Sequence, residues 1–138
     1  MLLEVQDLRV DFSTAKGPLY AVRGVDLLLQ EGELLGIVGE SGSGKSVTAH
    51  ALLRLIPGNG TISKGSIRYR GEEVFSLGRE QLRRYRGGEV SMIFQEPGRS
   101  FDPIYTVGKA MEETIRAHSP DLEPGAVRER SIQLLKEV

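Results

Sequence analysis

The sequence predicts an α/β fold, and three features of its 138 residues indicate this class. The N-terminal residues alternate between apolar and polar side chains, which is typical of β-strands with one buried face. A short apolar run at Leu34–Val38 has the length and composition of a buried parallel strand. A glycine-rich loop joins that run to a segment with helical spacing, and strand, loop and helix in this order indicate an α/β core.

Two strands and two turns are expected before the glycine loop. The stretch LLEVQDLRVDF alternates, and LYAVRGVDLLLQ returns as a second strand after a turn at Lys16–Pro18. Another turn at Glu31–Glu33 leads into the apolar run. We therefore expect an antiparallel hairpin followed by a buried strand.

Helices and strands are both expected after the loop. The stretch KSVTAHALLRLI has helical spacing, and a proline and two glycines follow it. Its apolar face would comprise Val47, Ala51, Leu52, Leu55 and Ile56. Next come a strand at GSIRYRG, a short helix at REQLRRYR and a buried strand at Glu89–Gln95. Two helices are expected at TVGKAMEETIRAH and EPGAVRERSIQLLKEV. The last pattern runs to Val138, so we expect the sequence to be part of a longer domain.

Composition excludes several classes of function. The net charge of −1 gives no field that would attract nucleic acid, and we expect no nucleic-acid partner. The sequence has no cysteine, which excludes disulfides and thiolate chemistry within it. The N-terminus lacks the basic start and apolar centre of a signal peptide, and no apolar run approaches the ~20 residues that span a bilayer. We therefore expect a cytoplasmic protein that reaches a membrane only through a partner.

The loop GESGSGKS fits the phosphate-binding pattern G-x-x-x-x-G-K-[ST] at Gly39, Gly44, Lys45 and Ser46. Glycines let the backbone turn tightly and approach a bulky anion. Successive backbone N–H groups and the helix N-terminus then supply positive charge. Lys45 would lie on the outer phosphates, and the Ser46 hydroxyl would bind Mg²⁺. The alternative interpretation is a flexible surface loop, whereas a dinucleotide-binding loop is excluded because G-x-G-x-x-G is missing.

The sequence around this loop resembles the ATP-binding cassette (ABC) ATPases. GESGSGKS is similar to the Walker A loop of that family, and MIFQEP at Met92–Pro97 resembles its Q-loop. The longer stretch SMIFQEPGRSFDPIYTVG resembles the branch that imports oligopeptides, dipeptides or nickel. The resemblance covers residues 1–138 and implies a P-loop NTPase core with an antiparallel β-subdomain at 1–95. Residues 96–138 would form the Q-loop and the start of a helical subdomain, truncated before the signature motif and Walker B.

The resemblance also implies roles for single residues. Phe12 would stack on adenine, and Gln95 would reach both Mg²⁺ and the attacking water. Ser46 would be the second protein ligand of Mg²⁺. The other nucleotide contacts would come from Gly39, Glu40, Ser41, Gly42, Ser43, Gly44, Lys45, Val47 and Thr48. The alternatives are a core phenylalanine at Phe12 and a polar strand end at Gln95.

The implied function is that of the ATP-binding subunit of an ABC importer for peptides or nickel, with ATP and Mg²⁺ as cofactors. Its partners would be a second ATPase subunit and a transmembrane permease that contacts Glu96–Tyr105, at the inner face of the membrane. Within 1–138 we find no signature motif, Walker B aspartate, following glutamate or switch histidine. This chain alone is therefore expected to bind ATP without hydrolysing it. The alternative is a nucleotide-binding or regulatory module without turnover.

Overall fold

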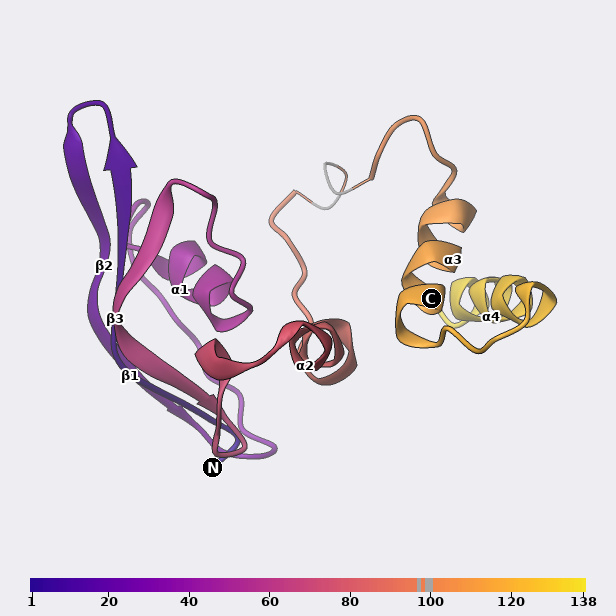
Figure 1. Ribbon diagram of the computed structural model, residues 1–138, viewed down its shortest axis with the longest axis horizontal. Helices are drawn as coiled ribbons and strands as arrows, with labels where there is room; N and C mark the ends of the chain where they lie inside the picture. Colours follow the sequence, from indigo (N-terminus) through magenta and orange to yellow (C-terminus); the bar gives the residue numbers. More distant parts are fainter. Residues whose placement is uncertain (97, 99–100) are drawn as a thin grey trace. The chain divides into compact units, whose positions relative to one another are not determined.

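The computed structural model describes residues 1–96, 98 and 101–138. These residues form two compact units, Met1–Leu82 and Arg83–Val138, and Figure 1 labels the four α-helices and the three longer strands. The predicted subdomain boundary after Gln95 follows the family resemblance and stays a prediction.

The first unit is built on a four-stranded antiparallel sheet with the strand order β2-β1-β3-β4. The hairpin predicted from alternation is confirmed as β1 (Leu3–Thr14) and β2 (Gly17–Leu29). The strand predicted at GSIRYRG is confirmed as the C-terminal half of β3 (Gly60–Tyr69), which pairs with the other edge of β1 and with the short β4 (Glu72–Glu73). The central position of β1 explains why its apolar side chains form much of the core.

A β-bulge in β1 keeps its apolar side chains on one face. Val5 and Leu8 are both fully buried, although residues three apart on a regular strand face opposite sides. The pairing of β1 with both neighbours shifts register here, around Asp7, whose φ is 42°. On β3, Gly65 lies opposite with φ +99°, and a Cβ there would come within 2.5 Å of the Gln6 carbonyl oxygen. Only glycine fits at this close approach.

Helix α1 (Lys45–Leu52) packs against β1 and β2, and Figure 1 shows it beside the sheet. Thr48 and Ala51 are its buried residues. The helix ends before the predicted Ile56, because Arg54 takes a left-handed conformation with φ 51°. The Arg54 guanidinium then donates to the carbonyl oxygens of Val74 (3.3 Å) and Leu77 (3.0 Å), next to the 3₁₀ turn η1 (Val74–Ser76).

Two predicted strands, Leu34–Val38 and Glu89–Gln95, are wrong for this structure. Leu34 and Val38 are 97% and 94% exposed, and the run has no strand geometry. In the second segment Val90 makes only an isolated bridge, and Ile93 is 93% exposed. An extended apolar run becomes a strand only where a neighbouring strand supplies a hydrogen-bond ladder. Within the described residues, neither run pairs with a strand of the sheet.

The second unit is helical. The short helix α2 (Arg79–Arg84) forms as predicted and contains the boundary between the units, and η2 (Tyr85–Glu89) follows it. The two later predicted helices are α3 (Val107–His118) and α4 (Pro124–Lys136), which pack against each other. The Thr106 side chain caps α3 by accepting a hydrogen bond from the Lys109 N–H at 3.3 Å. No helix in the described part of the chain has the length and apolar character needed to cross a bilayer.

Candidate functional site

The glycine-rich loop Gly39–Ser46 leads directly into α1, and two of its glycines are required by the backbone. Gly44 is the N-cap of α1 with φ 92° and ψ 0°, a left-handed conformation. A Cβ at Gly44 would lie 2.5 Å from the Ala21 carbonyl oxygen, so the loop rests tightly against β2. Gly42 is also left-handed, with φ +81°, but an added Cβ there would meet nothing within 4 Å. The glycines therefore serve both the turn and the close packing.

The N-terminus of α1 carries unneutralised positive charge. The first bond of the helix runs from the Thr48 N–H to the Gly44 carbonyl at 2.8 Å, so the N–H groups of residues 45–47 precede the helical ladder. No side chain caps this end, and its first turn has no acidic residue. Free N–H groups and the helix dipole together favour an anion at this position.

The ammonium of Lys45 lies back over the loop. Its Nζ donates to the carbonyl oxygens of Gly39 at 2.7 Å and Glu40 at 2.6 Å, and to Ser43 Oγ at 3.2 Å. Three acceptors match the three donors of the ammonium. Lys45 is the cationic side chain of the loop. A phosphate that binds in the loop would therefore replace these oxygens as the acceptor of the Lys45 hydrogen bonds.

The serine hydroxyls of the loop are open to solvent, whereas the Thr48 hydroxyl, further along α1, is not. Ser41, Ser43 and Ser46 are exposed, and Ser46 stands in the first turn of α1 where a metal ligand is predicted. Thr48 is only 5% exposed and lies in the core of the first unit. The predicted nucleotide contact of Thr48 thus has little side-chain surface to use and stays a prediction.

A magnesium ion at Ser46 would depend on oxygen ligands from a nucleotide. In the described part of the chain, no cluster of three or more His, Asp or Glu side chains could hold a metal ion. Magnesium is commonly bound by one or two protein oxygens together with substrate phosphates and water. The exposed Ser46 hydroxyl beside an anion-binding helix end fits that kind of site.

Phe12 lies near the end of β1, opposite Gly60 on β3. A Cβ on Gly60 would come within 2.7 Å of Phe12 Cε1, so the ring lies over this glycine. Phe12 is half-buried. One part of the ring therefore contacts the sheet, and adenine stacking on the remainder stays a prediction.

Gln95 and the predicted permease contact belong to the second unit. Gln95 is exposed, and its proximity to the loop stays a prediction because the loop lies in the first unit. Within Glu96–Tyr105, the apolar side chains of Phe101, Ile104 and Tyr105 are 49%, 84% and 49% exposed. Residues 97, 99 and 100 lie outside the described residues.

Both histidines have structural contacts. His50 Nδ1 forms a hydrogen bond with the Ser46 carbonyl oxygen, one turn back on α1. The His118 ring lies against Gly87, where an added Cβ would be 2.7 Å from Nε2. The main site feature that the sequence did not reveal is the set of acceptors for Lys45, because backbone carbonyls carry no sequence signal.

The comparison with protein families matches residues 22–138 to the family described as ABC transporter. A putative peptide import ATP-binding protein of Brucella abortus is 47% identical over 137 residues, which are 99% of this chain and 41% of that protein. The oligopeptide transport ATP-binding protein OppD of Bacillus subtilis is 42% identical over 136 residues, 98% of this chain and 38% of that protein. The probable D,D-dipeptide transport ATP-binding protein DdpD of Escherichia coli is 41% identical over 138 residues, 99% and 42% of the two chains. The chain thus spans about two fifths of the length of these relatives.

Solved structures show the same fold. The ATP-binding cassette MJ0796, as a post-hydrolysis dimer bound to ADP and Pi, matches with a TM-score of 0.78 and 21% identity. The match covers 98% of this chain and 56% of that one. A second dimeric structure of MJ0796 matches with a TM-score of 0.76 and 20% identity, with the same coverage. At this identity the likeness establishes the fold, which agrees with the α/β class predicted from the sequence.

Proposed function

The chain belongs to the ABC transporter family, and from that premise we propose that it is the ATP-binding portion of a peptide importer's ATPase subunit. The names of the relatives at 41–47% identity all refer to peptide, oligopeptide or dipeptide transport, which supports peptides over nickel as the cargo. The observation that carries the proposal is the loop before α1. It combines a left-handed Gly44, an uncapped helix N-terminus and a lysine whose ammonium lies over the loop.

Binding of ATP would begin with an exchange of partners at Lys45. Its ammonium would leave the neutral carbonyls of Gly39 and Glu40 for the charged oxygens of the β- and γ-phosphates. The N–H groups at the start of α1 would donate to the same phosphates. Ser46 would hold Mg²⁺, which neutralises phosphate charge when bound. The adenine would stack on the open part of the Phe12 ring.

Hydrolysis would need groups that residues 1–138 do not supply. Phosphoryl transfer depends on positioning and on charge stabilisation around the γ-phosphate. Gln95 would orient the attacking water, but a general base is a separate contribution, often worth about 10²–10⁴-fold in rate. We therefore propose that this chain binds ATP and that turnover belongs to the longer subunit paired with a second copy. A nucleotide-binding module without turnover is the second candidate, favoured by the same lack of a base.

The proposed partners follow from the family. A transmembrane permease would contact the Glu96–Tyr105 region, and a second ATPase subunit would face the nucleotide. The exposure of Phe101, Ile104 and Tyr105 supports an interface there, because exposed apolar side chains grouped together often mark interaction sites. This arrangement would place the protein in the cytoplasm, at the inner face of the membrane.

Titration calorimetry with a series of ligands tests the proposal. ATP and ADP should bind the 138-residue chain, whereas adenosine should bind much more weakly, because the loop recognises phosphate. Thr14→Ala, far from the loop in sequence and at the hairpin turn, is a control that should leave ATP affinity unchanged. Equal affinity for adenosine and ATP would contradict binding through the loop.

A further inference from the structure

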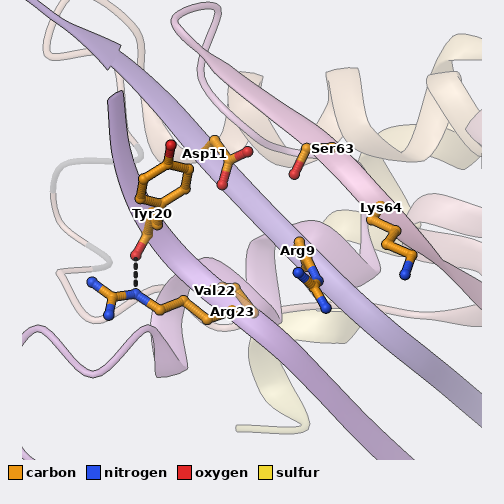
Figure 2. Close-up of a pocket in the computed structure, with 7 residues that line it drawn as sticks. All are labelled: Arg9, Asp11, Tyr20, Val22, Arg23, Ser63 and Lys64. Carbon is orange, nitrogen blue, oxygen red and sulfur yellow. Dashed lines mark hydrogen bonds between the residues drawn. The ribbon is translucent and has the colours of Figure 1, made fainter. Parts of the chain in front are cut away.

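A pocket lies on the sheet, lined by residues of the strands and not by the loop Gly39–Ser46. It has a volume of about 530 Å³, and Figure 2 shows its lining residues on β1, β2 and β3. Along β1, Arg9 and Asp11 alternate with the fully buried Val10, so they lie on the face opposite to the core. The hydroxyl-bearing side chains of Tyr20 and Ser63 also line the pocket.

Three cations occupy paired positions across this face. Arg9 on β1 pairs with Arg23 on β2 and with Lys64 on β3. Like charges directly opposite each other on neighbouring strands destabilise a sheet. A solvated charged face is the simplest explanation of single exposed lysines and arginines, but it does not account for three in one row around a hollow.

Asp7 holds two of these cations together. Its Oδ1 accepts from Arg9 Nε at 3.0 Å, and its Oδ2 lies 2.8 Å from Lys64 Nζ. The hydrogen bonds from Lys64 and Arg9 hold the pKa of the Asp7 carboxyl below its ordinary value, so it stays ionised at neutral pH. Asp11 is the second carboxylate beside the pocket. Asp26 on β2 is a third carboxylate close by, because its Oδ1 accepts from the Asp7 N–H at 2.7 Å. Three cations against three carboxylates balance in charge, so recognition of a ligand here would depend on hydrogen-bond donors and not on a net positive charge.

Many donors around the pocket have no protein partner in the part of the chain that the structure describes. Arg9 uses only Nε, which leaves both Nη groups, and Lys64 has only Asp7 as an acceptor. Arg23 donates Nε to the Tyr20 carbonyl at 3.2 Å and turns along β2, as Figure 2 shows, with its Nη groups left over. An arginine fork and an ammonium with unused donors match the several acceptors of a phosphate group.

We propose that this pocket binds a phosphate-bearing small anion. Arg9 and Lys64 contribute most of the charged hydrogen-bond donors from adjacent strands, Arg23 bounds the β2 side, and the hydroxyls of Tyr20 and Ser63 add neutral donors. The volume falls within the range of about 300–1,000 Å³ that is common for small-molecule sites. A hollow among side chains suits a free anion better than the flat surface of a membrane.

Nuclear magnetic resonance with ¹⁵N-labelled chain and inorganic pyrophosphate tests this site. Pyrophosphate should shift the amides of Arg9, Ser63 and Lys64, separately from those of the loop at residues 42–46. In the double variant Arg9→Gln with Lys64→Gln, the shifts on the sheet should need about tenfold more pyrophosphate or more. The loop shifts should be unchanged, which also reports that the variant is folded. The control pair Lys16→Gln and Arg79→Gln removes the same charge outside the pocket and should change neither set.

Three results would overturn the proposal. The first is that millimolar pyrophosphate shifts no amide on the sheet, and the second is that it shifts them equally in the parent chain and the double variant. The third is that the parent chain, but not the double variant, sediments with phosphatidylglycerol vesicles while pyrophosphate causes no sheet shifts, because the face would then bind a lipid headgroup. Missing shifts at residues 42–46 alone would contradict the proposed function and leave this site standing.

Discussion

Replacement of Lys45 by alanine should weaken ATP binding about tenfold or more. The Lys45 ammonium makes three hydrogen bonds of 2.6–3.2 Å in the loop, all to uncharged oxygens. Hydrogen bonds with an ionised donor or acceptor are roughly twice as strong as neutral ones and contribute about 1.5–3 kcal/mol net, and a phosphate oxygen adds the attraction between opposite charges. Lys45 gives up its loop acceptors when it binds phosphate. Its contribution to ATP affinity is therefore the difference in free energy between its bonds to phosphate and its bonds to the loop. We therefore expect a loss of about 1.4 kcal/mol at least, a factor of ten in Kd.

Titration calorimetry measures this loss, with Lys16→Ala as the matched control. Lys16 lies in the exposed hairpin turn, so its replacement removes the same charge without touching the loop. The free energy of unfolding should change by no more than about 0.5 kcal/mol in Lys16→Ala, because Lys16 is exposed; Lys45 is half-buried and bonded to the loop, so the fold of Lys45→Ala is checked by its thermal melt before the titration. Equal ATP affinity of Lys45→Ala and the parent chain would refute the role given to this lysine.

Three further predictions concern adenine, the loop backbone and turnover. Phe12→Ala should weaken ATP and GTP binding alike, by roughly 1–3 kcal/mol, since stacking does not read base edges; unchanged calorimetric affinity would make Phe12 a core residue only. Gly44→Ala should lower the thermal midpoint of unfolding by several degrees, because an alanine in the left-handed conformation destabilises the fold by about 1–2 kcal/mol and its Cβ would clash with the Ala21 carbonyl oxygen. Gly42→Ala, with the same sign of φ but open space around it, should cost less in the same circular dichroism melt, and equal costs would contradict the close packing. Finally, phosphate release from Mg-ATP by this chain should not exceed that of Lys45→Ala, and turnover clearly above that control would reveal an overlooked base.

The exposed apolar run Leu34–Val38 carries a prediction about association. With Leu34 and Val38 almost fully exposed and no strand beside them in the described residues, concentrated samples of the chain should self-associate. Replacing Leu34 by aspartate should reduce the apparent mass in sedimentation velocity at high concentration. A chain that stays monomeric throughout would show that the run is covered in solution.

Local patterns predicted the elements whose partners are near in sequence. Alternation identified β1 and β2, which pair through a short turn, and helical spacing identified α3 and α4. The glycine loop was predicted with its helix because G-x-x-x-x-G-K-S fixes both the turn and the helix start. The bulge at Gln6–Asp7 was not predicted, because it emerges only from the pairing of β1 on both sides.

The remaining features depend on partners that periodicity does not encode. Leu34–Val38 has the composition of a strand, but strand formation requires a neighbour to pair with. The end of α1 at Leu52 depends on the left-handed Arg54 and its contacts with distant carbonyls. The row of cations around the sheet pocket arises from the register of three strands, and no local motif joins Arg9 with Lys64.

A crystal structure of the chain with a non-hydrolysable ATP analogue tests the central claim most directly. Our account predicts that the β- and γ-phosphates lie in the loop, with Lys45 Nζ within about 3 Å of a phosphate oxygen and no longer bound to the Glu40 carbonyl. The N–H groups at the start of α1 should point at the same phosphates. A nucleotide bound elsewhere, or bound in the loop while Lys45 keeps its carbonyl partners, would contradict it.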